Sequence, residues 1–494
     1  MGIPTLNEVI QRLARGANVA PLVLEIPADT WTPVAAFLRL TRPGEPSFLL
    51  ESVEGGEHMA RYSFLGSGPF ETLAVENGSA RRIREDGTVV PLPGNPFLAL
   101  GRRIRDFDSA PAPGLPRFCG GAVGTLDYSM VRHLEPTARI PARPGAEARL
   151  MLFGNVVAFD HLRHRMLLIA NVIREEGIST VSAYRKARRA LNAMRERLFR
   201  PFPALKPRRP GPRAGTPRFP SGPAAERAFL EGAAGLKGHI RAGDIFQAVL
   251  SSRADIPVAG PPFSVYRALR ALNPSPYMFF VDYGQETALG ASPEMLVRVE
   301  GGLVEARPIA GTRPRGGSEE EDDRLEKSLL SSVKEKAEHL MLVDLGRNDV
   351  GRVSRAGSVR VPSFMKVERY SHVMHLVSSV KGRLRRGLSA WDAFASCFPA
   401  GTVTGAPKIR AMQLLARAET APRGLYAGAV ACCDFRGNLD SAIAIRSLCM
   451  SRKGKAWTAQ VQAGAGIVAD SSPRRELEEI KSKARVLLEA IRTA

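Results

Sequence analysis

The sequence predicts an α+β fold of two lobes, built mainly from antiparallel sheets with helices packed outside them. Apolar runs at 148–160 and 164–173 have the pattern of strands, and 179–199 has that of an amphipathic helix. After residue 223, helix-like and strand-like segments are mixed, and no strict alternation of strand, helix and strand appears. Parallel sheets are built from such alternating units, so antiparallel sheets are the more natural architecture.

The chain has one obvious seam, the proline- and arginine-rich segment 200–223. Prolines forbid regular structure there and favour an exposed connector. Beyond it, 224–243 has a helical pattern, whereas 278–284 and 287–292 resemble strands. A chain of 494 residues exceeds the usual size of one domain. We therefore expect an N-terminal region at 1–200, a linker at 201–222 and a C-terminal region at 223–494.

Composition narrows the choice of partners. A formal net charge of +21 would ordinarily suggest nucleic acid or an anionic membrane. The excess is mostly arginine scattered along the chain, without the aromatic interleaving of a single-strand binder, so we expect no nucleic acid partner. No apolar run approaches a membrane span, and we expect no membrane partner. Five cysteines in neither a disulfide framework nor a metal pattern fit the reducing cytoplasm.

The segment 306–315 carries Arg307, Arg313 and Arg315 around Gly311. Guanidinium groups match carboxylates, and a glycine lets the backbone come close to a ligand. The plain alternative is a solvated basic loop. We interpret the segment as an anion-binding turn and expect a small carboxylate as substrate.

Two glycine-rich stretches are not nucleotide sites. The stretch 401–408 has Ala406 and Pro407 where a phosphate-binding loop needs glycine and lysine. Near Gly464 and Gly466 the next helix begins only at Pro473, too late for a dinucleotide fingerprint. We expect these two glycines to let backbone amides approach a small acid.

Two helices carry acidic stripes. Glu335 and Glu338 share one face of a helix predicted around 325–343, and Glu476 and Glu479 share a face of the C-terminal helix. Either stripe alone is more often a solvated face. Together they offer the oxygen ligands that Mg²⁺ prefers.

Five segments after the seam resemble, in order, the chorismate-utilising enzymes, and specifically the large (synthase) subunit of anthranilate synthase, a lyase. The resemblance covers most of 223–494 and extends more thinly into the N-terminal region. It implies a sandwich of two antiparallel sheets with the active site between them and a catalytic, chorismate-binding region at 223–494. The segments are 338–352, 370–382, 398–412, 426–446 and 462–483.

The resemblance also assigns roles around the metal and the reacting ring. Glu338 and Glu479 are implied as direct Mg²⁺ ligands, and Glu335 and Glu476 as ligands through water. The other implied roles are proton donation to the departing 4-hydroxyl by Glu294, contact with incoming ammonia by Gln247, a hydrogen bond to the substrate from Thr402, and help in pyruvate elimination by His375. Only the motif register favours His375 over His372.

Substrate contacts and reaction type follow from the same resemblance. Tyr426, Arg446, Gly464 and Gly466 are expected at the enolpyruvyl carboxylate. Aminodeoxychorismate synthase, the closest alternative, typically has a lysine where Ala310 stands, and relatives that add water have a lysine where Gln247 stands. Amination at C2 by ammonia, giving anthranilate and pyruvate, is therefore expected. The remaining expected substrate contacts are Ala310, Gly311 and Lys483.

The resemblance also implies a regulatory site and a partner subunit. Segments 48–66 and 273–280 resemble those that form the tryptophan feedback site, although the first also reads simply as strand, turn and strand. No glutaminase nucleophile motif is present, which implies a separate glutamine amidotransferase subunit and a hetero-oligomer, a heterotetramer in the family. A basic nucleic-acid-binding protein stays as the alternative suggested by charge alone. The expected tryptophan contacts are Ser52, Pro276, Tyr277 and Met278.

Overall fold

The computed structural model describes residues 3–494 except 15, 53–60, 112, 143, 176, 202–216, 371–372 and 455. Most of the predicted linker and His372 therefore lie outside the described residues. Among the described helices, none is long and apolar enough to cross a membrane.

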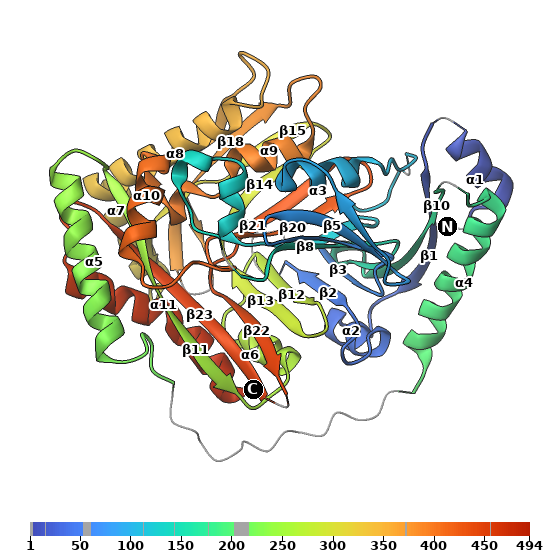
Figure 1. Ribbon diagram of the computed structural model, residues 1–494, viewed down its shortest axis with the longest axis horizontal. Helices are drawn as coiled ribbons and strands as arrows, with labels where there is room; N and C mark the ends of the chain where they lie inside the picture. The colour runs from blue at the N-terminus through green and yellow to red at the C-terminus, as the bar shows by residue number, and fades with distance from the viewer. Residues whose placement is uncertain are drawn as a thin grey trace.

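Two large antiparallel sheets form the centre of the molecule (Figure 1). Strands from before and after the seam share both sheets, because β2 pairs with β12 in the first and β7 pairs with β20 in the second. In spatial order, the first sheet contains β1 (Val19–Pro27), β10 (Arg165–Ile173), β9 (Asn155–Asp160), β3 (Tyr62–Ser67), β2 (Ser47–Glu51), β12 (Tyr277–Asp282), β13 (Glu286–Ser292), β22 (Ser447–Lys453), β23 (Ala456–Ile467), β11 (Gln247–Val258) and β19 (Gly405–Ala406).

The second sheet is also antiparallel. One of its strands, β17, lies outside the main strand order and pairs with β18. In spatial order it contains β16 (Ile309–Pro314), β18 (Val373–Arg383), β15 (Leu303–Ala306), β14 (Met295–Glu300), β21 (Leu439–Ile443), β20 (Ala429–Asp434), β7 (Gly121–Leu126), β8 (Ala146–Phe153), β4 (Glu71–Glu76), β5 (Ser79–Arg84) and β6 (Val89–Leu92), with β17 (Arg360–Arg369).

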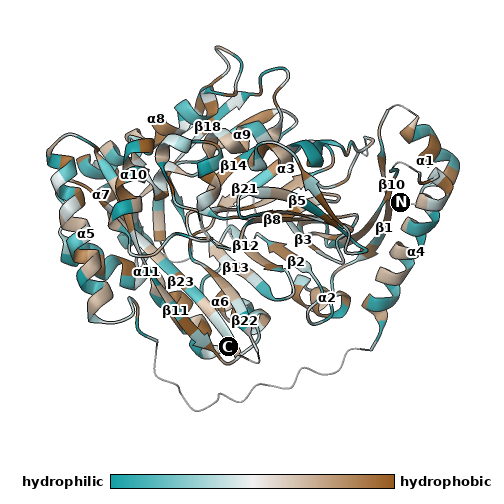
Figure 2. Ribbon diagram, in the orientation of Figure 1, coloured by the Kyte–Doolittle hydropathy of each residue, from teal (hydrophilic) through white to brown (hydrophobic). Residues whose placement is uncertain are grey.

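Helices cover the outer faces of both sheets, and the outer helices show more hydrophilic surface than the central strands (Figure 2). The α-helices are α1 (Leu6–Leu13), α2 (Pro33–Leu40), α3 (Pro96–Arg105), α4 (Thr180–Phe199), α5 (Pro223–Arg241), α6 (Pro262–Leu272), α7 (Glu319–Ser331), α8 (Val333–Gly351), α9 (Ala390–Cys397), α10 (Lys408–Ala418) and α11 (Pro473–Thr493). The 3₁₀ helices are η1 (Tyr128–His133), η2 (Pro136–Ala138), η3 (His161–Arg163) and η4 (Gly401–Val403).

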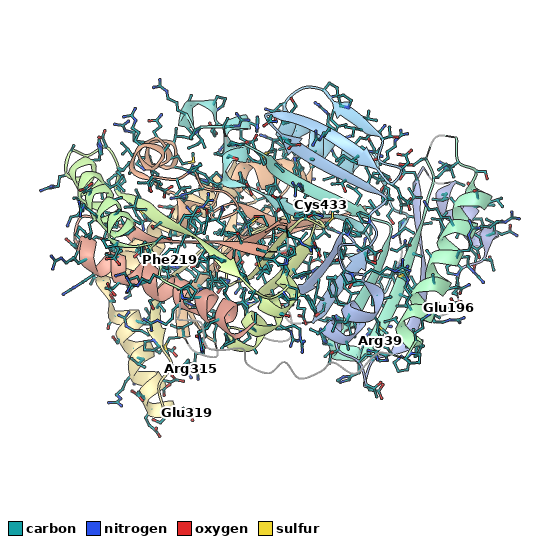
Figure 3. All side chains as sticks on the ribbon, turned by 60° about the horizontal axis from the view of Figure 1, so that its bottom comes forward. Arg39, Glu196, Phe219, Arg315, Glu319 and Cys433 are labelled. Carbon is teal, nitrogen blue, oxygen red and sulfur yellow. The ribbon has the colours of Figure 1, made fainter. Side chains whose placement is uncertain are left out.

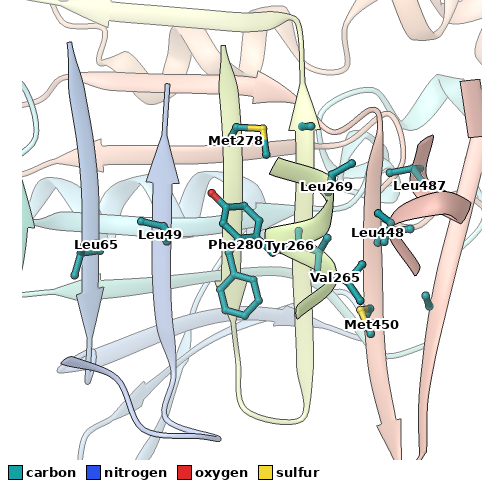
Figure 4. Close-up of a cluster of buried hydrophobic side chains, with 14 of the residues drawn as sticks. Leu49, Leu65, Val265, Tyr266, Leu269, Met278, Phe280, Leu448, Met450 and Leu487 are labelled. Carbon is teal, nitrogen blue, oxygen red and sulfur yellow. The ribbon is translucent and has the colours of Figure 1, made fainter. Parts of the chain in front are cut away.

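The apolar core is divided into layers. Phe48 and Phe279 of the first sheet pack with Phe153 of the second in the cluster between the sheets. A larger cluster fills the space between the first sheet and its helices, where Tyr266 of α6 lies over Phe280 of β12 (Figure 4). A third cluster joins the second sheet to α3, α8 and α9. The predicted α+β sandwich is confirmed.

Two predictions of local structure were wrong. The helix expected around 325–343 is two helices, because Ser332 between them is extended and its hydroxyl accepts a hydrogen bond from the Glu335 amide in the first turn of α8. The segment 306–315 is not a turn: most of it forms β16, with an irregularity at Gly311, whose φ is 63°. The C-terminal helix begins at Pro473, as predicted.

Two glycine substitutions test this packing. A Cβ on Gly124 would lie 1.9 Å from the Arg149 carbonyl oxygen, so Gly124→Ala is expected to lower the free energy of unfolding by about 3 kcal/mol or more. The matched control, Gly235→Ala in α5, meets no atom within 4 Å and is expected to raise it by roughly 0.5–1 kcal/mol. Denaturant unfolding measures both changes, and a neutral Gly124→Ala would contradict the register of β7 against β8.

Candidate active site

A cavity of about 270 Å³ lies where the two sheets meet the acidic helices. Its walls come from β11 and β23 of the first sheet, β16 and β18 of the second, and from α8, α11 and η4. The structure brings together most of the predicted site residues here. Those that line the cavity are Gln247, Glu294, Ala310, Glu338, His375, Thr402, Tyr426, Arg446, Gly464, Gly466, Glu479 and Lys483.

Three predicted residues lie just behind the cavity wall. The Gly311 carbonyl oxygen is 3.0 Å from His375 Nδ1. Glu335 forms an ion pair with Arg313 at 3.2 Å. The charge of Glu479 acts on Glu476, one turn earlier on α11.

The acidic helices bring their carboxylates into one another's field. Burial raises the pKa of Glu338, and the charges of Glu335 and Glu479 raise it further. Burial also raises the pKa of Glu476, and Glu479 adds to that shift. Negative charge from α8 and α11 is therefore concentrated at one edge of the cavity.

These carboxylates are partly held by neighbouring donors. Glu338 Oε1 accepts a hydrogen bond from Gln247 Nε2 at 3.3 Å, and Glu479 pairs with Lys483 at 2.7 Å. Within the described part of the chain, no group of three or more His, Cys, Asp or Glu side chains is set to hold a metal ion. A magnesium ion that takes only two protein carboxylates and keeps water and substrate as its other ligands fits Glu338 and Glu479.

Arg446 supplies an opposite charge to the cavity. Its half-buried side chain follows β21 from a backbone with φ of 48°, a conformation that non-glycine residues rarely adopt. No hydrogen bond or ion pair joins its guanidinium to another described residue, and burial lowers its pKa. The cavity therefore contains a desolvated cation without a counter-ion among the described residues, which favours an anionic ligand.

Glu294 lies directly before β14, on the buried side of the cavity. Burial raises the pKa of its carboxyl group to about 7, although the Thr402 hydroxyl and the Lys483 charge lower it in part. A protonated carboxyl group is thus well populated at neutral pH and can donate a proton.

His375 projects from β18, and its Nδ1 lies 3.0 Å from the Gly311 carbonyl oxygen and 3.1 Å from Thr312 Oγ1. A carbonyl oxygen only accepts hydrogen bonds, so Nδ1 carries the proton and Nε2 keeps a lone pair. Burial lowers the pKa of this imidazole, which favours the neutral form. His375 is therefore equipped to accept a proton.

The expectation that three arginines of 306–315 face the substrate was wrong. Arg307 pairs with Glu368, Arg313 with Glu335 and Arg315 with Asp322, and none of the three lines the cavity. Arg315 and Glu319 lie on the projecting part of the molecule in Figure 3. The sequence could not show this, because two of the three partners are distant in the chain.

Gln462 was missed by the sequence analysis, although it lines the cavity. Residues two apart on a strand share one face, so Gln462 lies on the same face of β23 as Gly464 and Gly466. That spacing is the signal that would have found it.

A second, narrower cavity of about 60 Å³ lies between strands of both sheets. It is lined by all four predicted tryptophan contacts, Ser52, Pro276, Tyr277 and Met278. Asp440 also lines this cavity, and it forms ion pairs with Arg117 and Arg298 at 3.0 and 3.1 Å. The residues predicted from two distant segments therefore meet around one space.

The pKa of Glu294 gives a test that needs no turnover. Its carboxyl group is expected to be protonated below about pH 7 and to ionise as the pH rises through that value. Difference infrared spectra of the unmodified chain against Glu294→Gln isolate its C=O stretch. A band already lost at pH 5 would contradict the inferred burial.

Comparison with known proteins agrees with this geometry. The chain is 44% identical to anthranilate synthase component 1 of Acetivibrio thermocellus, over 100% of this chain and 99% of that one. It is also 44% identical to that of Pseudomonas putida, over 99% and 98%. A solved structure of anthranilate synthase component I from Streptococcus pneumoniae superposes with a TM-score of 0.75 at 37% identity, covering 94% of this chain and 99% of the other. The family model for chorismate binding enzymes matches residues 45–489, and the chain belongs to that family.

Proposed function

We propose that this chain is the synthase component of an anthranilate synthase, which converts chorismate and ammonia to anthranilate, pyruvate and water. Relatives of 44% identity over the full length carry the name anthranilate synthase component 1. The observation that carries the proposal is the cavity itself, which is lined by carboxylates of two helices and by Arg446, a cation without a side-chain partner among the described residues.

Arg446 and Tyr426 would bind the enolpyruvyl carboxylate. Burial raises the pKa of Tyr426 to about 12, so its hydroxyl stays protonated and donates a hydrogen bond. A Cβ on Gly464 would lie 2.4 Å from the Tyr426 hydroxyl oxygen, so only glycine leaves room at this position. Together with the amides near Gly464 and Gly466, these donors would form an anion site.

Glu338 and Glu479 would hold Mg²⁺ directly, and Glu335 and Glu476 through water. When bound, Mg²⁺ would neutralise the ring carboxylate and withdraw electron density from the ring. Burial raises the pKa of Glu338 most, and the charges of Glu335 and Glu479 add to the rise; this supports the assignment, since a bound cation would relieve the repulsion.

Two residues that line the cavity would transfer protons. Glu294 would protonate the departing 4-hydroxyl, which leaves as water, while Thr402 holds the substrate. Gln247 would contact ammonia as it attacks C2. Ala310 lines the cavity without offering a nucleophile, which supports direct attack by ammonia. His375 would then take the C2 proton as pyruvate is eliminated and the ring becomes aromatic.

The name component 1 of the relatives supports a separate partner component. We propose a glutamine amidotransferase subunit that delivers ammonia, assembled with this chain into a hetero-oligomer in the cytoplasm. Region 223–494 would bind chorismate, and region 1–200 would contribute Ser52 to a regulatory site.

Turnover tests the proposal directly. Purified chain with chorismate, Mg²⁺ and ammonium salt is expected to form anthranilate and pyruvate in equal amounts. Glu338→Gln is expected to lower the Mg²⁺-dependent rate by about 100-fold or more, since it removes a ligand oxygen charge. Asp344→Asn, on the exposed face of the same helix, is the control. An aminated product that keeps its enolpyruvyl group would indicate aminodeoxychorismate synthase instead.

The second cavity supports feedback control by tryptophan. Its apolar walls suit an indole ring, and Asp440 with its two arginines offers charges for an amino acid. Tryptophan is expected to inhibit the unmodified chain, and Ser52→Phe, which narrows the cavity, is expected to relieve inhibition without changing the uninhibited rate. Initial rates with tryptophan or phenylalanine test this, and an unchanged rate at saturating tryptophan would refute it.

A further inference from the structure

A buried ion pair between Glu419 and Arg423 lies against the wall of the candidate active site, and none of the roles proposed above involves it. Its side chains are 7% and 1% exposed. We infer that this pair positions the cavity wall, and that through Ser251 it aims the amide of Gln462 at a hydrogen-bond donor of the bound reactants. The inference rests on the proposed function.

The pair ties two walls of the cavity together. Arg423 Nε and Nη2 contact the Glu419 carboxylate at 2.9 and 2.7 Å. Arg423 Nη1 donates to the Val403 carbonyl oxygen at 2.7 Å, and Nη2 donates to that of Val249. Val403 and Val249 both line the cavity, from η4 and β11. One planar guanidinium therefore sets the distance between these two elements.

The same guanidinium supports Tyr426. It lies 5.5 Å from the centre of the Tyr426 ring, within the range of a cation–π contact. On its other side the tyrosine hydroxyl approaches Gly464 of β23. The ring is thus held between a fixed cation and the strand that would bind the substrate carboxylate.

Ser251 connects Glu419 to Gln462 by hydrogen bonds and so fixes the orientation of the Gln462 side chain. Glu419 Oε1 accepts from the Ser251 amide at 2.9 Å and from its hydroxyl at 2.6 Å. Since the only hydroxyl proton is given to the carboxylate, Ser251 Oγ can only accept, and it accepts from Gln462 Nε2 at 2.9 Å. The amide cannot flip, because its carbonyl oxygen would then meet another acceptor.

This fixes Gln462 Oε1 as an unfilled acceptor. The residue is 4% exposed, and its Oε1 is buried with no hydrogen-bond partner among the described residues. Gln462 lines the cavity on the face of β23 that carries Gly464 and Gly466. The carboxylates of chorismate cannot donate, so the donor is an N–H of ammonia or the ring hydroxyl.

An ion pair of this kind is costly to bury and is weak evidence for stability. Every oxygen of Glu419 and each terminal nitrogen of Arg423 is nevertheless used, and the contacts end on cavity elements. The arrangement therefore fits orientation of the site better than stabilisation of the fold.

The experiment compares Ser251→Ala, Gln462→Leu and the double variant in chorismate turnover, with KM for ammonia and for chorismate measured separately. Each single variant is expected to raise KM for the same reactant by roughly tenfold, the effect of one lost hydrogen bond. The double variant is expected to match Gln462→Leu, because both changes act along one path. Ser252→Ala, the same substitution on the opposite face of β11, is the control.

Outcomes separate this inference from the proposed function. If the unmodified chain forms no product, the proposed function fails and this inference fails with it. If the unmodified chain turns over and Ser251→Ala keeps the KM values of Ser252→Ala, only the inference is overturned. Effects that multiply in the double variant would likewise overturn the path through Ser251. Unfolding temperatures of all variants show whether the fold is intact. A loss of stability alone would lower the amount of active enzyme and leave KM unaltered.

Discussion

Repulsion between carboxylates of α8 and α11 is the constraint on which the site depends. Glu338 and Glu479 stay within each other's field only because each helix is docked by its own apolar stripe. Leu477, Ile480 and Leu487 bury α11 in the cluster of the first sheet, and Val343 and Val350 bury α8 in that of the second. The sandwich therefore holds together two like-charged groups that would separate if either helix were free.

The cavity also contains charges of both signs. Carboxylates gather at one edge, whereas Arg446 stands without a counter-ion among the described residues. Burial raises the pKa of Glu294 to about 7, so that its neutral form is well populated near pH 7, and burial lowers the pKa of His375, which favours the neutral imidazole. Such a set of groups would suit an acid with two carboxylates, and it would leave Glu294 and His375 to transfer protons.

Local patterns predicted much of this arrangement. Helix spacing placed Glu335 with Glu338 and Glu476 with Glu479, and the family resemblance supplied the residues that line the cavity. Side-chain pairs between residues distant in the chain could not be predicted from the sequence. The ion pair of Arg307 with Glu368 spans 61 residues, and the bond from Gln462 to Ser251 spans 211. No periodicity encodes such partners, so the orientation of Gln462 emerged only from the assembled sheets.

A crystal structure with metal and substrate bound is the decisive experiment for this site. Crystals of Glu294→Gln grown with Mg²⁺ and chorismate would show where cation and substrate bind. The metal is expected between Glu338 and Glu479 and in contact with one substrate carboxylate, and the second carboxylate is expected on Arg446. Metal bound elsewhere, or Arg446 left without an anion when chorismate is present, would contradict it.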